Sequence, residues 1–303
     1  MNIYDIKFSC CIIRVMKAFL YHKQFCPKCG KQYDAARVHC PYCDAMNQNE
    51  EVTRSWKECT PLGPGRELLA LFIGYIGLSI ISTFVQVVLI ISCWSGISAS
   101  GLQVGELANG IFSLSDISTG KGLAIVFFPS YVLLFSIFVL FLWADIKPIL
   151  LRFKKGASYL GALLALVAMY AFNIVYNILT IKFTGGQVNQ NQSNVVSIVK
   201  LYPFTSLIVF GILGPFVEEC TYRLGLFNLL KRFSTIGAYL LSALFFAAIH
   251  FDWSNPSVLE WLNIPPYFFS GFVFAFIYDK IGFGASYLAH AANNIISVLA
   301  SIQ

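Results

Sequence analysis

Long apolar runs follow one another from residue 68 to the end of the chain. Four of these runs lack Asp, Glu, Lys and Arg: 68–94, 122–143, 156–181 and 282–302. Each can cross a bilayer as a helix, which takes about 20 apolar residues. Three further runs are shorter or interrupted by ionisable groups: 202–229, 234–251 and 265–278. The pattern predicts an all-α polytopic membrane protein with about seven transmembrane helices.

Composition and charge support a membrane protein and suggest its orientation. The chain is 57% hydrophobic and 12% charged, against about 25% charged in soluble domains. Ten Lys and Arg residues precede the first run and four lie in the loop 145–155. Because cytoplasmic loops retain positive charge, the N-terminus is predicted in the cytoplasm and the C-terminus outside. This topology explains most of the net charge of +6, so no nucleic-acid partner is expected.

The segment before the first run contains two C-x2-C pairs, formed by Cys26, Cys29, Cys40 and Cys43. Two such pairs, each on a tight turn, can complete a closed four-thiolate zinc site with Zn–S distances of about 2.3 Å. Gly30 follows the first pair, as in zinc knuckles. The alternative is redox dithiols or free thiols, but a reducing cytosol favours metal. A closed structural Zn²⁺ site is expected to fold a small module that docks a cytosolic partner, not to catalyse.

The predicted organisation has four parts. They are an uncertain N-terminal extension (1–24), the zinc ribbon (25–44), a linker with Pro and Gly at its end (45–66) and the membrane domain (67–303). Met16 offers an alternative start that would bring the ribbon close to the N-terminus. No cleavable signal is expected, because the first long apolar run begins only at residue 68. The low-complexity segment 184–194 is predicted to be a solvated outer loop.

Three charges interrupt the run 202–229. An ionisable residue at mid-membrane costs about 2.5–3.5 kcal/mol, so each needs a partner or a purpose. Glu219 and Arg223 are four residues apart, which places them within salt-bridging reach on one face of a helix. Glu218 is rotated about 100° from Glu219 and is left free. A free carboxylate that faces a wet cavity is a candidate general base.

Two later runs contain histidines with a second residue at helical spacing. Phe246 and His250 are four apart, as are His290 and Asn294. A single intramembrane histidine is usually a satisfied packing or hydrogen-bonding residue. Together with the charges of the run 202–229, however, these side chains place polar groups on three separate helices. One shared polar site explains these residues better than three unrelated sites, each of which would have to offset the cost of its own buried polar groups.

These residues resemble the CPBP family of intramembrane proteases, which includes the prenyl-protein CAAX proteases and bacterial immunity-type homologues. The family's EExxxR, FxxxH and HxxxN motifs fall in order at Glu218, Glu219 and Arg223, at Phe246 and His250, and at His290 and Asn294. The resemblance covers roughly residues 200–300. It implies a helical core whose polar residues converge on a cavity open toward the cytosol. It also implies peptide hydrolysis by a glutamate-activated water.

The resemblance further implies a role for each residue. Glu218 and His250 would position and deprotonate the water, while His290 and Asn294 would donate to the oxyanion. Such donors contribute about 2.7–4 kcal/mol each. The glutamate–arginine pair would set the helix, and Phe246 would shape the pocket wall. Whether a catalytic metal takes part stays open, but no H-E-x-x-H motif is present, which favours none.

The predicted function is therefore that of an intramembrane endopeptidase acting on a membrane-associated protein or peptide. The zinc ribbon resembles those at the N-termini of many bacterial membrane proteins, so the expected location is a bacterial plasma membrane. Relatives of this kind are linked to bacteriocin self-immunity or peptide processing. The alternatives are a non-catalytic membrane scaffold or immunity factor, and an ion-coupled transporter. The absence of a repeated apolar pattern argues against the transporter.

Overall fold

A computed structural model describes most of the 303-residue chain. The described residues are 23–34, 40, 42–43, 45–48, 62–100, 120–145, 149–150, 153 and 156–302. Nearly all of the expected N-terminal extension and most of the expected linker lie outside these residues. We call the described residues between 23 and 48 the cysteine head.

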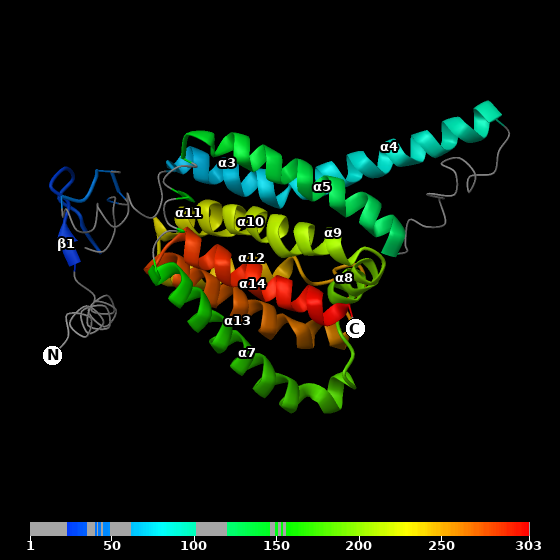
Figure 1. Ribbon diagram of the computed structural model, residues 1–303. Helices are drawn as coiled ribbons and strands as arrows, with labels where there is room; N and C mark the ends of the chain where they lie inside the picture. The colour runs from blue at the N-terminus through cyan, green and yellow to red at the C-terminus, as the bar shows by residue number, and fades with distance from the viewer. Residues whose placement is uncertain are drawn as a thin grey trace.

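The cysteine head contains a two-stranded antiparallel sheet of β1 (Lys23–Phe25) and β2 (Gln32–Asp34) (Figure 1). The turn between the strands holds the first cysteine pair. The Gly30 N–H donates to the Cys26 carbonyl at 2.8 Å, and the Cys26 N–H donates to the Lys31 carbonyl at 2.9 Å. Gly30 has φ +69°, a left-handed conformation that costs glycine little. The glycine after the first pair therefore closes the turn that presents both thiols.

The rest of the described chain is helical. The first half comprises α3 (Pro64–Tyr75), α4 (Gly77–Ser100), α5 (Gly120–Phe141), the 3-10 turn η3 (Trp143–Asp145), α7 (Gly156–Thr184) and α8 (Gln190–Leu201). One interrupted helical stretch follows, made of α9 (Pro203–Ile208), η4 (Val209–Leu213), α10 (Gly214–Glu219), η5 (Cys220–Phe227) and α11 (Asn228–Lys231). The chain ends with α12 (Thr235–Ala248), α13 (Val258–Lys280) and α14 (Phe283–Ser301). Each of the seven predicted runs falls in helix.

Among the described residues, four helical stretches are long and apolar enough to cross a membrane: Pro64–Val88, Gly120–Phe141, Gly156–Thr184 and Pro203–Lys231. The other three predicted runs fall short of this requirement. Helix α12 has 14 residues and spans about 21 Å at 1.5 Å per residue, less than the ~30 Å hydrocarbon core. Helices α13 and α14 carry more polar residues. The predicted count of about seven thus combines four clear spans with three helices that are shorter or more polar.

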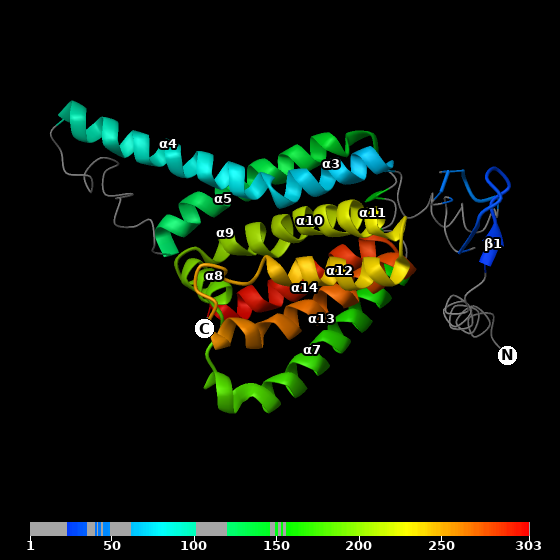
Figure 2. The same cartoon turned by 180° about the vertical axis from the view of Figure 1, so that it is seen from behind.

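The two ends of the helical bundle differ in chemistry. At one end Arg66 pairs with Asp145 at 2.6 Å, and Arg232 pairs with the buried Glu67 at 2.7 Å. These pairs join the start of α3, the turn after α5 and the turn after α11, so we call this the head end. The cysteine head lies beyond it, while α8 and the C-terminus lie at the opposite end, the far end (Figures 1 and 2).

Two π-helical stretches flank α10, the short helix that carries both glutamates. Stretch η4 precedes it and η5 follows it. A π-turn widens a helix and shifts the direction of its side chains, and such turns are frequent at functional sites. Helix α3 packs closely against η5, because a Cβ on Gly225 would lie 2.8 Å from the Leu71 backbone nitrogen. The glutamates therefore sit on an irregular, tightly supported segment.

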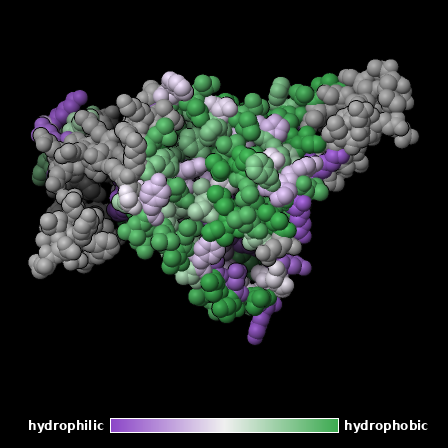
Figure 3. Space-filling view, viewed as in Figure 1, coloured by the Kyte–Doolittle hydropathy of each residue, from purple (hydrophilic) through white to green (hydrophobic). Residues whose placement is uncertain are grey.

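Apolar side chains cover much of the helical part in the space-filling view (Figure 3). On α7, Ile174, Val175, Ile178 and Leu179 are all exposed. Apolar surface of this extent indicates contact with another apolar medium. With the helical bundle and the cysteine head both present, the predicted fold class is confirmed: the chain is an all-α polytopic membrane protein preceded by a small four-cysteine module.

One local prediction is wrong. The segment 184–194 is not a solvated loop throughout, because α8 begins at Gln190. Asn189 caps this helix by accepting the Gln192 N–H at 3.1 Å, and its side chain is buried. Asparagine is a favoured N-cap residue, so the amide-rich composition that suggested a loop supplies a helix start instead.

Candidate active site

Glu219 lies at the centre of a buried polar cluster. One carboxylate oxygen, Oε2, accepts hydrogen bonds from Arg223 Nε at 3.2 Å and from the Ser286 hydroxyl. The other, Oε1, lies 3.0 Å from His290 Nδ1. Glu219 and Arg223 are completely buried, and the ion pair predicted from their spacing is confirmed. Glu219 thus connects η5 to α14.

Arg223 completes its surroundings with aromatic rings. Its guanidinium carbon lies 5.4 Å from the ring centre of Phe246 and 5.9 Å from that of Phe274. The two terminal Nη atoms find no hydrogen-bond acceptor among the described residues. Cation–π contacts within about 6 Å stabilise a desolvated guanidinium. Phe246 therefore supports the arginine as well as shaping the pocket wall.

His290 bridges the two glutamates. Its Nδ1 meets Glu219, and its Nε2 lies 3.6 Å from Glu218 Oε2. The imidazole stacks on Phe274 with 4.5 Å between ring centres. A proton on Nδ1 shared with the carboxylate fixes the tautomer and leaves Nε2 as the nitrogen that faces Glu218.

Glu218 lies at the edge of this buried cluster, next to His290. Its side chain is 15% exposed, and Oε2 has no hydrogen-bond partner among the described residues. It lines a cavity of about 190 Å³ together with Tyr131, His250 and Asn294. The geometry matches the prediction of one carboxylate held by arginine and one left free.

His250 follows the last turn of α12 and is held from several directions. Its Nδ1 lies 2.7 Å from the Phe246 carbonyl oxygen, and its ring stacks on Tyr267 with 4.3 Å between centres. Its own carbonyl accepts a hydrogen bond from Asn189 Nδ2 at 3.0 Å. The ring is thereby oriented at the cavity wall, with Nε2 left for a further partner.

Asn294 is held by the backbone of η4. Its Nδ2 donates to the Phe210 carbonyl at 3.1 Å, while its Oδ1 accepts from Asn293 Nδ2 at 3.3 Å. A primary amide has two N–H groups. One N–H of Asn294 therefore remains for a ligand.

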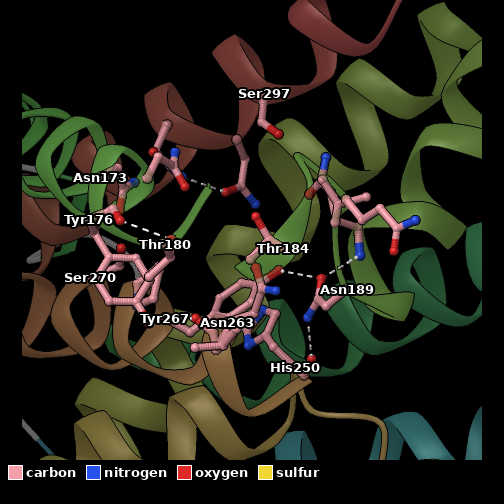
Figure 4. Close-up of a pocket in the computed structure, with 18 of the residues that line it drawn as sticks. Asn173, Tyr176, Thr180, Thr184, Asn189, His250, Asn263, Tyr267, Ser270 and Ser297 are labelled. Atoms are coloured by element: carbon pink, nitrogen blue, oxygen red, sulfur yellow. Dashed lines mark hydrogen bonds between the residues drawn. The ribbon is translucent and has the colours of Figure 1, made fainter. Parts of the chain in front are cut away.

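The predicted site residues meet at two adjoining cavities. The larger, of about 580 Å³, is lined by His290 among others, and His250 and Asn294 line both cavities. His250 appears at the wall of the larger cavity in Figure 4. Glu219 and Arg223 lie behind the wall and hold His290 in place. The structure thus brings all six predicted polar residues into one connected group.

A comparison with known protein families gives a match over this part of the chain. Residues 200–296 match the family model described as type II CAAX prenyl endopeptidase Rce1-like. Residues 200–296 form an Rce1-like domain. The match includes every predicted polar residue of the site, from Glu218 to Asn294. Comparisons with curated proteins and with solved structures gave no match.

The match supports an intramembrane protease in general for residues 200–296. It confirms the resemblance that the three motifs suggested. The Rce1-like domain begins at the end of α8 and reaches into α14. Helices α3, α5 and α7 lie outside the matched residues, yet the chain uses them to cover the site.

Several residues of the site were not predicted from the sequence. They are Ser286 on Glu219, Asn189 and Tyr267 on His250, and Tyr131 beside Glu218. Ser286 precedes His290 by four residues, so its spacing carried a usable signal. Asn189 and Tyr131 lie outside the Rce1-like domain and reach the site through tertiary packing. No local pattern could have identified them.

The cavities lie toward the far end of the bundle. Helix α12 begins next to the turn that holds Arg232 at the head end, so His250, after its last turn, lies at the far end. The larger cavity is also lined by Thr184, the last residue of α7, and by Asn189, which follows this helix. The predicted cytoplasmic head would place these cavities toward the outer side of the membrane, whereas the resemblance implies a cavity open toward the cytosol.

The four cysteines of the head form a compact cluster. Cys26 and Cys43 have their sulfurs 3.5 Å apart, Cys29 and Cys40 3.6 Å apart, and all four sulfurs lie within 4.8 Å of one another. A disulfide requires about 2.05 Å, whereas sulfurs at tetrahedral positions 2.3 Å from zinc are about 3.8 Å apart. The cluster fits a four-thiolate metal site.

The ionisation of the cluster is consistent with a cation at its centre. Burial disfavours the Cys26 thiolate, but the N–H groups of Cys29 and Lys28 outweigh this and lower the pKa of Cys26 to about 6. The N–H of Ala45 favours the Cys43 thiolate, yet burial and the neighbouring sulfurs raise the pKa of Cys43 to about 12. A bound divalent cation would relieve this repulsion and deprotonate the remaining thiols.

Proposed function

We propose that the Rce1-like domain is a CPBP-type intramembrane endopeptidase that hydrolyses a peptide bond of a membrane-associated protein or peptide. The observation that carries the proposal is the unpartnered Oε2 of Glu218, which lies at a cavity wall 3.6 Å from His290 Nε2. A carboxylate next to an oriented imidazole is suited to taking a proton from water.

The contacts favour His290 as the partner of Glu218. The resemblance assigned the role of Glu218's partner to His250. Among the histidine nitrogens of the described residues, however, Nε2 of His290 is the one within charge-pairing distance of Glu218. Glu219 orients His290 through Nδ1, as a carboxylate orients the imidazole of a catalytic triad. We therefore assign water activation to Glu218 and His290.

The reaction then proceeds by direct attack of water. Glu218 takes one proton as the water oxygen bonds to the peptide carbonyl carbon. The remaining N–H of Asn294, which lines the same cavity, donates to the oxyanion, a contribution of about 2.7–4 kcal/mol. His250 donates its Nδ1–H to the Phe246 carbonyl, so its Nε2 can accept a hydrogen bond from the attacking water. Glu218 then gives its proton to the departing amine nitrogen, and the carbon–nitrogen bond breaks. No catalytic metal is required by this scheme.

The head is proposed to hold Zn²⁺ in a structural role. All four ligands are cysteine sulfurs, so a zinc ion there would have no open position for substrate. We propose that the folded head docks a cytosolic partner of the protease. A bacterial plasma membrane and a role in bacteriocin self-immunity or peptide processing are further proposals, which rest on the resemblance.

The test uses the purified full-length protein in detergent micelles, incubated with a pool of apolar and amphipathic peptides. New amino termini are counted with an amine-reactive dye. Glu218→Gln is expected to lower the rate by about 10²–10⁴ while leaving thermal stability close to that of the unsubstituted protein. Asp252→Asn, in the exposed loop after His250, serves as a matched control and should remain active.

Three results would count against the proposal. Full activity of the Glu218→Gln protein would show that Glu218 is not the base. If Glu219→Gln were well folded and inactive while Glu218→Gln stayed active, the base would be the other glutamate. A protein in which Glu218→Gln changes no function at all would instead fit a membrane scaffold.

A further inference from the structure

The larger cavity has an unusual lining for a site inside a membrane protein. Its walls contain no Asp, Glu, Lys or Arg among the described residues. They are rich in primary amides and hydroxyls, which lie around the opening in Figure 4. The primary amides include those of Asn173, Asn263 and Asn293.

The amides keep hydrogen-bonding capacity for a ligand. The Oδ1 atom of Asn173 is buried and has no partner among the described residues. Asn263 uses one N–H on the Leu259 carbonyl at 2.8 Å, and Asn293 uses one on Asn294. Each amide therefore retains capacity for both donating and accepting. Polar groups in a low-dielectric setting are costly unless a ligand or water pairs them.

This chemistry selects among possible occupants. A charged group would find no counter-ion on the walls. An isoprenoid chain would form no hydrogen bonds with the amides and would displace the water that hydrogen-bonds to them. An extended peptide backbone presents alternating N–H and C=O groups, which primary amides complement in both directions. The volume of about 580 Å³ falls within the range of sites that take small ligands.

The cavity also adjoins the proposed chemistry. His250, His290 and Asn294 line it directly, so a peptide bound along the amides would bring a carbonyl to these residues. Thr184, at the end of α7, and Asn189, just after this helix, also line it. A substrate would therefore enter from the far end of the bundle, opposite the cysteine head.

We propose that the larger cavity is a subsite for an uncharged, extended peptide segment entering from the far end, bound through its backbone by the amides of Asn173, Asn263 and Asn293. The proposal rests on the proposed protease function and specifies its substrate class. A subsite of this kind would select the membrane-flanking part of a substrate by its lack of charge.

Binding is measured on the catalytically impaired Glu218→Gln protein, so that it does not depend on turnover. The probe is a fluorescent peptide of about ten Ala, Ser, Thr and Val residues, titrated by anisotropy against the full-length protein in micelles. In that background Asn173→Leu should weaken binding about tenfold, the effect of losing roughly one hydrogen bond. This substitution breaks no hydrogen bond within the fold, because the Asn173 Oδ1 has no partner. Asn255→Leu, in the exposed loop 251–257, is the matched control and should bind like the parent.

A protection experiment locates the bound peptide. Gln187→Cys places a thiol at the cavity rim, and Phe233→Cys places one on the exposed turn at the head end. Labelling by a maleimide, corrected for the unsubstituted protein, should slow at position 187 when the peptide is present and stay unchanged at position 233.

Three outcomes would overturn the inference: no binding of the uncharged peptide, equal binding by Asn173→Leu, or binding that requires a prenyl group on the peptide. Each can occur while the parent protein still cleaves peptides, so the inference can fail without the proposed function. Conversely, peptide binding without any cleavage would support the subsite and refute the protease.

Discussion

Replacing Arg223 by methionine removes the cation that faces Glu219 inside the bundle and keeps most of the apolar stem. The two side chains are completely buried and 3.2 Å apart. Breaking a buried pair on one side leaves an uncompensated charge and costs about 3–5 kcal/mol. At about 2–4 °C per kcal/mol for a domain of 150–250 residues, the melting temperature should fall by about 6–20 °C.

The assay is thermal unfolding of the purified protein in detergent, followed by size-exclusion chromatography of the heated sample. Arg66→Met is the comparison variant, because Arg66 pairs with Asp145 at the head end and is 39% exposed, against 11% for the Asp145 side chain. Solvent reaches this arginine and weakens the pair, so this variant should lose less stability than Arg223→Met.

A double substitution separates charge from packing. Glu219→Gln together with Arg223→Met leaves no buried charge and keeps an amide that can still meet Ser286 and His290. Because replacing both members of a buried pair is often neutral, the double variant should recover much of the lost stability. If Arg223→Met unfolds no earlier than Arg66→Met, or if the double variant is as unstable as the single one, the buried ion pair does not hold this site together.

The remaining predictions concern the head, the supporting residues and the topology. Mass spectrometry should find a single zinc per chain, lost in Cys40→Ser, and chelation should leave peptide cleavage intact, since the thiolate site is closed. Ser286→Ala should lower the free energy of unfolding by about 1–3 kcal/mol, measured by thermal unfolding, because Glu219 loses a buried donor. Asn294→Ala should slow cleavage by about 10²–10³ in rate assays, as expected for an oxyanion donor. A C-terminal reporter should be active outside the cytoplasm; activity inside would reverse the predicted orientation or change the span count.

The local features of this protein were predictable from its sequence. Seven apolar runs became helices because apolar length and the absence of charge are signals carried by each run alone. The Glu219–Arg223 pair followed from a spacing of four residues on one helix. The cysteine cluster followed from two C-x2-C pairs and the glycine after the first.

Features that depend on distant contacts were not predictable. Asn189 reaches the His250 carbonyl across 61 positions of sequence, and nothing near Asn189 signals this contact. His290 lies closer to Glu218 than His250 does, and this difference depends on how α14 packs against α10. To predict that the cavity lies at the far end, one would need the direction of every helix, and sequence motifs do not carry this information.

The most direct measurement of the central claim compares membranes from cells that produce the protein with membranes from cells that produce Glu218→Gln at equal levels. Protein amino termini are labelled and identified in both. The proposed mechanism predicts a set of new termini in uncharged, membrane-flanking segments that appears with the unsubstituted protein and is absent with Glu218→Gln. Identical sets of termini from the two membranes, with both proteins folded, would contradict peptide hydrolysis by Glu218.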